Sequence, residues 1–264
     1  MNFKKEKLFR FIFMAAVAVI PVLIASCEKK DEAMPLKKEY NDKTTLAILY
    51  GDKKLPEFKE CSQCKEQYIA AGAYINSGDC DEAFYEMEKL SGKKYSLASE
   101  TIGRMYEAGI CKPRNLSKAF EWYKKAAEQG SLAASYNIGL MYMTGEGTEE
   151  NWEKGAESMA YAAAGGVIPA KKQLGAMFLK GIGVNKNAEL AVAMYSSAAA
   201  DGDAESMNVL AEMYMSGIGV EKDEKKAFDL FSKAVKAGNI AAKRNIAYSY
   251  YNGAGTKQIG RAHV

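Results

Sequence analysis

Residues 210–220, LAEMYMSGIGV, contain the pattern that decides the fold of this chain. An apolar, helix-like run ends there in Gly217-Ile218-Gly219. A glycine pair of this kind can open a helix at a phosphate-binding loop. It can also form a turn, because glycine readily adopts the left-handed backbone that ends a helix. Whether the pair recurs along the chain decides between the two interpretations.

Glycine recurs with a period of 36 residues through most of the chain. Alanine, methionine and aromatic residues follow the same period between the glycines. The recurring Gly-x-Gly turns lack the Lys-Ser/Thr pair of a P-loop, and a fixed period is typical of repeat architectures. We therefore interpret the glycine pair as the turn of a repeated unit. The two series of glycines are Gly109, Gly145, Gly181, Gly217 and Gly253, and Gly130, Gly166, Gly202 and Gly238.

Each unit is expected to form a hairpin of two helices. In the fourth unit the first helix is predicted from about Ala204 to Ser216, and the second ends near Ala237. Asp223 stands where the second helix needs an N-cap acceptor. A glycine inside a helix costs about 1 kcal/mol relative to alanine, so glycines kept in the first helices predict close approach of a neighbouring helix. The equivalent cap residues are Asn115, Asn151 and Asn187, and the glycines are Gly103, Gly139 and Gly175.

The units resemble the Sel1-like repeat, a relative of the tetratricopeptide repeat. Its pattern, A-x-x-x-L-G-x-M-Y-x-x-G-x-G-V-x-x-D-x-x-K-A-x-x-x-Y-x-x-A-A-x-x-G, is matched closely by residues 134–166 and 170–202, and nearly as well by 206–238. The first unit has Cys111 at the second loop glycine, and the last unit begins at Ala242. The resemblance implies an all-α, right-handed superhelical solenoid of stacked helix-turn-helix repeats over residues 96–256, with four full units and one partial.

The resemblance also implies a protein or peptide partner bound on a concave face that the first helices line. Positions that vary between units are the candidates for this face, although residues that are merely exposed to solvent would vary in the same way. We expect a monomer that acts as a scaffold or adaptor. The candidate residues are Glu100, Arg104, Tyr136, Leu140, Lys172, Asn208, Glu212, Arg244 and Tyr248.

The N-terminus resembles a bacterial lipoprotein signal peptide, residues 1–26. A basic start precedes the apolar run 11–25, which is too short for a stable transmembrane helix. The sequence Ile-Ala-Ser-Cys that ends at Cys27 matches the lipoprotein cleavage box. The resemblance implies acylation of Cys27 and attachment to a membrane of the cell envelope, and Glu28 favours the outer membrane. Residues 27–43 are charged and are expected to form a flexible tether.

Residues 44–95 are interpreted as an irregular segment followed by a degenerate hairpin that caps the solenoid. Four cysteines, Cys61, Cys64, Cys80 and Cys111, allow three disulfide pairings in an oxidising compartment. Cys80 and Cys111 each follow the turn glycine of adjacent hairpins, so the preferred pairing is Cys61 with Cys64 and Cys80 with Cys111. A thioredoxin-like redox site and a zinc site are the alternatives.

Other functions find little support. A net charge of +3 is too small to predict nucleic-acid binding. The chain has no G-x-S-x-G motif, and its one histidine is His263. We expect no catalysis, cofactor or metal. The alternative is an envelope enzyme or cell-wall-binding protein, as implied by relatives with cysteines in each repeat; units two to four of this chain contain none.

The segment 257–264 is expected to be foreign to the protein. Its last six residues, 259–264, match one reading frame of a sequencing adapter. The natural reading is therefore expected to break off near Gln258, and the complete protein to continue further. His263 then carries no functional information.

Overall fold

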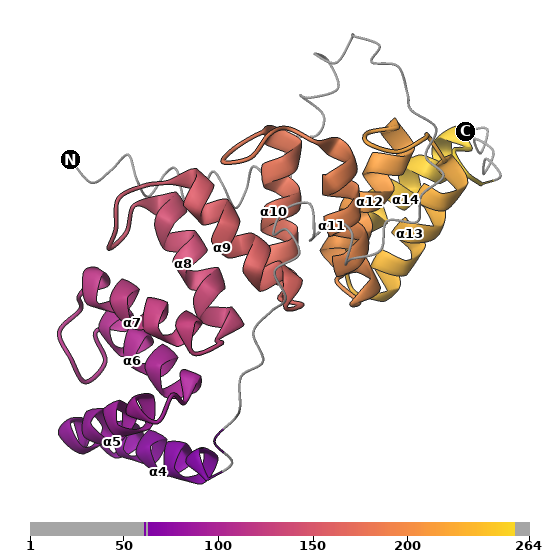
Figure 1. Cartoon of the computed structure of the whole chain (residues 1–264). Helices are drawn as coiled ribbons and strands as arrows, with labels where there is room; N and C mark the ends of the chain where they lie inside the picture. Colours follow the sequence, from indigo (N-terminus) through magenta and orange to yellow (C-terminus); the bar gives the residue numbers. More distant parts are fainter. Residues whose placement is uncertain (1–60, 62, 257–264) are drawn as a thin grey trace, which may run out of the picture. The chain divides into compact units, whose positions relative to one another are not determined.

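The computed structural model describes residues 61 and 63–256, all of which fall within one compact unit. The expected signal peptide, Cys27, the tether, residues 44–57 and the segment 257–264 lie outside the described residues. Within the described part, eleven α-helices account for all the regular secondary structure (Figure 1). The predicted all-α class is therefore confirmed.

The helices form pairs, and within each repeat we call the first helix A and the second helix B. The capping hairpin consists of α4 (Cys64–Ser77) and α5 (Cys80–Gly92). The helices A are α6 (Ser96–Ala108), α8 (Leu132–Thr144), α10 (Ile168–Lys180), α12 (Ala204–Ser216) and α14 (Ile240–Asn252). The helices B are α7 (Leu116–Glu128), α9 (Trp152–Ala164), α11 (Ala188–Ala200) and α13 (Glu224–Lys236).

Every helix packs mainly against the helix before it and the helix after it (Figure 1). This one-dimensional pattern of contacts is that of a solenoid, in which each repeat is stabilised by its neighbours. The predicted limits of α12 are correct, and α13 ends one residue before the predicted Ala237.

The glycine pair of residues 217–219 is a turn. Gly217 ends α12 in the left-handed conformation with φ of 71°, and the equivalent glycine ends each other helix A in the same way. The predicted N-caps are also present: the Asn115, Asn151, Asn187 and Asp223 side chains accept hydrogen bonds from backbone N–H groups three residues on.

The glycines inside the helices A mark close helix crossings, as predicted. A Cβ at Gly103 would lie 2.8 Å from the ring of Tyr123, and one at Gly175 would lie 2.9 Å from the ring of Tyr195. Both tyrosines are buried in the second helix of the same repeat. The large side chain of helix B therefore fills the space that the small residue of helix A leaves.

Candidate binding site

The candidate residues on the helices A fall into three groups by exposure. Arg104, Arg244 and Tyr248 are exposed, and Glu100 and Asn208 are buried. The remaining candidates, Tyr136, Leu140, Lys172 and Glu212, are partly buried. A partner could reach the first group directly, whereas the buried residues have contacts inside the solenoid.

Those internal contacts join successive repeats. Ser131, the N-cap of α8, donates a hydrogen bond of 2.7 Å to the Glu100 carboxylate in α6. Two units further on, the Lys172 ammonium donates to Asp203, the N-cap of α12, at 3.4 Å, and also to Glu205. The column that contains Glu100, Lys172 and Asn208 thus contributes an inter-repeat polar ladder.

The ladder ends in an amide and carboxylate cluster between α12 and α14. The Asn245 amide donates to the Asn208 oxygen at 3.0 Å and to Glu212 at 2.9 Å. Burial raises the pKa of the Glu212 carboxyl, while hydrogen bonds from Asn245 and Asn208 and the charge of Arg244 oppose this shift. Glu212 is therefore a carboxylate whose ionised form is disfavoured by its surroundings.

A surface hollow of about 460 Å³ lies at the start of the solenoid, where the cap meets the first two repeats. We call it the cap hollow. Its apolar lining includes Ile75 of α4, Met105 and Ala108 of α6, and Ile110 of the following turn. The polar part consists of Thr101, Arg104 and Glu107 of α6, Tyr123 of α7 and Asn137 of α8.

The polar groups of the cap hollow differ in their hydrogen-bond and ion-pair partners. The Tyr123 hydroxyl donates to the Glu107 carboxylate, and burial together with this bond raises the pKa of Tyr123. The Arg104 guanidinium pairs with Glu100 at 2.8 Å, yet its side chain remains 64% exposed. Within the described part of the chain, the Asn137 amide has no hydrogen-bond partner. The hollow therefore presents an apolar base beside an accessible guanidinium and an available amide.

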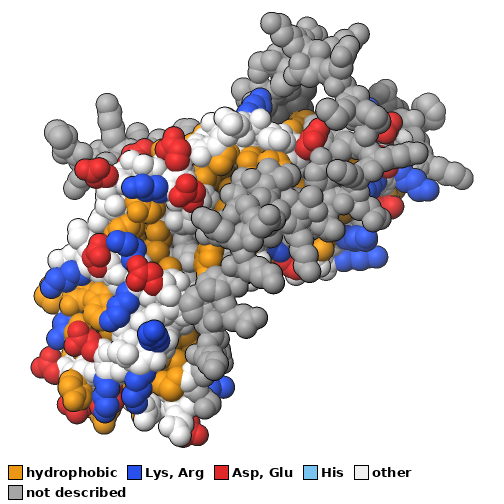
Figure 2. Space-filling view, viewed as in Figure 1, with side chains coloured by type: hydrophobic (Ala, Val, Ile, Leu, Met, Phe, Trp, Pro, Cys, Tyr) orange, Lys and Arg blue, Asp and Glu red, His pale blue; other side chains and the backbone are white. Residues whose placement is uncertain are grey.

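Figure 2 shows apolar side chains interspersed with charged ones over the α4–α7 part of the surface. Only Arg104 among the candidate residues lines the cap hollow. Thr101 and Asn137 occupy the same position of helix A in two repeats, next to the predicted column. The fact that both are polar is the sequence signal that could have identified them. Ile75 and Tyr123 come from the cap and from a helix B, which a search restricted to helix A columns leaves out.

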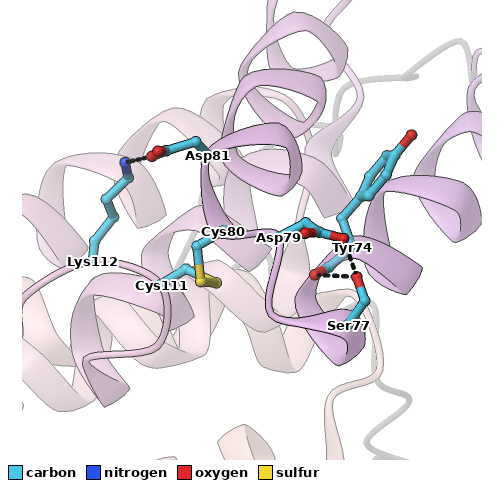
Figure 3. Close-up of a disulfide and its surroundings, with 7 residues drawn as sticks. All are labelled: Tyr74, Ser77, Asp79, Cys80, Asp81, Cys111 and Lys112. Carbon is cyan, nitrogen blue, oxygen red and sulfur yellow. Dashed lines mark hydrogen bonds and ion pairs between the residues drawn. A yellow bond between two sulfur atoms is a disulfide. The ribbon is translucent and has the colours of Figure 1, made fainter.

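Both disulfides of the preferred pairing are present. Cys61 and Cys64 are joined with their Cα atoms 5.2 Å apart, and Cys80 and Cys111 with theirs 4.8 Å apart (Figure 3). The first bridge lies within the cap and the second joins the cap to the first repeat. Among residues 61 and 63–256, no three metal-binding side chains gather into a cluster, and no helix there is long and apolar enough to span a bilayer.

The chain belongs to the Sel1 repeat family. The family model matches residues 95–131, 132–166, 168–203, 204–239 and 240–263, together more than half of the chain. The matches follow the 36-residue period found in the sequence and extend the fifth unit beyond the described residues. Proteins built from this repeat generally mediate protein–protein interactions.

Two solved structures are similar over most of the chain. One is a protective antigen present in uropathogenic Escherichia coli strains that displays an SLR fold, with 25% identity and a TM-score of 0.69 over 83% of this chain. The chain spans 46% of that protein. The other is a Sel1 repeat protein from Oxalobacter formigenes, with 27% identity and a TM-score of 0.68, covering 72% of this chain and 78% of that one. No curated protein matches the sequence.

Proposed function

We propose that this protein is a lipid-anchored scaffold or adaptor of the bacterial cell envelope that binds a protein or peptide partner on the face formed by its helices A. The observation that carries the proposal is the cap hollow. It joins apolar lining to an exposed guanidinium at Arg104 and the available amide of Asn137. A peptide offers both an apolar side chain for such a base and backbone groups that pair with an amide.

Binding is tested by site-specific photo-cross-linking in cells that produce the protein. A photoreactive residue is placed at Asn137 in the cap hollow or, as a control, at Glu157, which is exposed on α9. We expect a discrete cross-linked product from position 137 that weakens when Arg104→Glu is added. Equal products from both positions, or none from 137, would contradict binding at this face.

Anchoring is a separate part of the proposal and has its own test. It rests on the sequence around Cys27, the residue that would carry the acyl chains. Two or more chains at about 0.8 kcal/mol per buried methylene suffice for stable membrane attachment. Cys27→Ala should abolish labelling with a radioactive fatty acid and release the protein from membranes. Continued labelling would show that the anchor is elsewhere or absent.

A further inference from the structure

The junctions between successive repeats share one close contact. The second glycine of each turn has φ between 68° and 78° and lies against the first residue of the preceding helix B. A Cβ added at any of these glycines would overlap the carbonyl oxygen of that residue. Only a residue without a side chain permits this approach. The four contacts are Gly147 on Leu116, Gly183 on Trp152, Gly219 on Ala188 and Gly255 on Glu224.

The junction between the cap and the first repeat is built differently at the same place. Cys111 occupies the position of the second turn glycine and keeps its left-handed backbone, with φ of 61°. The residue opposite is Cys80, the first residue of α5 and thus the counterpart of Leu116 in α7. Here the two side chains form a disulfide (Figure 3). The covalent bond replaces the glycine contact of the other junctions.

This bridge fixes one end of the cap. The fully buried residues shared by the cap and first repeat include Cys64, Leu90 and Ala98, which stand at or near the opposite ends of their helices. At the bridged end the only ion pair between the two hairpins is Lys112 with Asp81, at 3.2 Å, among the described residues. The Asp81 side chain is fully exposed, and such surface pairs contribute little to stability.

The cap hollow lies at this same end. Ile110 directly precedes Cys111, and Ile75 stands in the last turn of α4, before the turn that leads to Cys80. The Phe84 and Tyr106 rings pack edge to face with their centroids 5.9 Å apart, and this contact keeps α5 packed against α6. Loss of the bridge would therefore free the turn and the wall that contains Ile75, while the hairpin stays attached.

We propose that the Cys80–Cys111 disulfide is a redox switch for the cap hollow, an inference that rests on the proposed binding function of this site. A dithiol reductant supplies two electrons and two protons, the Sγ–Sγ bond breaks, and two thiols form while the reductant becomes a disulfide. The Cβ of Cys111 then prevents the close approach that glycine allows elsewhere. The turn that contains Cys111 then separates from the start of α5, and the part of the cap that carries Ile75 no longer lines the hollow.

Exposure favours reaction at this bridge. Cys80 and Cys111 are both partly exposed, whereas in the other bridge Cys61 is partly exposed and Cys64 is fully buried. Thiol–disulfide exchange requires access of the attacking thiolate to a sulfur atom. Both cysteines of the Cys80–Cys111 bridge are therefore open to a dithiol, whereas the other bridge is open at Cys61 and closed at Cys64.

Amide hydrogen exchange of the full chain, oxidised or treated with dithiothreitol, tests the switch without a partner. We expect reduction to accelerate exchange about tenfold in residues 73–79 and 108–114, since local opening sets exchange rates. The equivalent glycine turn, residues 145–151, should not change. Cys80→Ser/Cys111→Ser should exchange fast with or without reductant. Cys80→Ala/Cys111→Gly, which restores the glycine contact, should exchange slowly in both conditions.

Three results would overturn the switch: unchanged exchange in 73–79 after reduction, equal acceleration in 145–151, or the same acceleration in an oxidised Cys61→Ser/Cys64→Ser variant. Failure of the proposed function would look different. In that case exchange would respond as expected, but cross-linking from position 137 would be absent even in the oxidised protein.

Discussion

The junctions between repeats and the junction between the cap and the first repeat differ in how the turn of one hairpin contacts the start of the second helix of the preceding hairpin. Between repeats, a glycine lies directly on the backbone of the preceding helix B, as Gly219 does on Ala188. At the cap, Cys111 and Cys80 carry side chains and a disulfide joins them. At this contact the repeat junctions depend on close backbone packing, while the cap junction depends on a covalent bond that a reductant can break.

Removal of the bridge should have the largest effect on stability. The disulfide closes a sequence separation of 31 residues, and loop-closure entropy predicts a loss of about 3–4 kcal/mol in the free energy of unfolding for Cys80→Ser/Cys111→Ser. Urea unfolding followed by circular dichroism measures it. The control, Cys61→Ser/Cys64→Ser, opens a separation of 3 residues and should lose about 2 kcal/mol. Equal losses would show that the long bridge does not constrain the cap.

A glycine substitution tests the other kind of junction. Gly219→Ala places a Cβ on the Ala188 carbonyl at φ of 69°, and we expect a loss of about 2–4 kcal/mol from overlap and backbone strain together. Gly202→Ala is the matched control, because its φ is 91° but nothing lies within 4 Å of the added Cβ. It should lose about 1–2 kcal/mol through backbone strain alone. A Gly219→Ala protein as stable as the control would mean that the contact is not needed.

The repeats could be predicted from the sequence because small residues recur in it with the period of the repeat. Gly217 had to adopt a left-handed backbone and Asp223 had to cap a helix, and neither depends on distant contacts. The cap hollow was not predictable from columns of equivalent residues. Its wall at Ile75 depends on the short turn between α4 and α5, and the position of Tyr123 depends on packing over Gly103.

The inter-repeat polar ladder was also not predicted from the sequence. Variation at Glu100 and Asn208 suggested exposure, yet both are buried. Each is hydrogen-bonded to a residue of the next unit in sequence, Ser131 for Glu100 and Asn245 for Asn208. Variation at a position between units is thus compatible with burial as well as with solvent exposure.

Glu212 gives the smallest predicted effect and tests how the ladder responds to pH. Because burial raises its pKa, the folded state favours the protonated carboxyl. The resulting stability is present at pH below the unfolded pKa and is lost as pH rises through the folded pKa. Glu212→Gln keeps an acceptor for Asn245 without the charge, so we expect a small gain in the free energy of unfolding at pH 7.

Urea unfolding between pH 4 and pH 8 checks this prediction, with Glu157→Gln on the exposed face of α9 as the control. The two variants should diverge as pH rises. A Glu212→Gln protein that is less stable than the wild type at pH 7 would show that the ionised carboxylate is needed by its amide partners.

The most direct test of the account is the affinity of the cap hollow for a peptide. A peptide is selected from a displayed random library against the oxidised full chain, and its Kd is measured by calorimetry. Ala108→Trp fills the hollow from the last turn of α6, while Ala200→Trp adds the same side chain to the exposed last turn of α11. We predict about 30-fold weaker binding, or about 2 kcal/mol, for Ala108→Trp and no change for Ala200→Trp. Unchanged affinity in both variants would contradict the assignment of the binding site to the junction of the cap and first repeat.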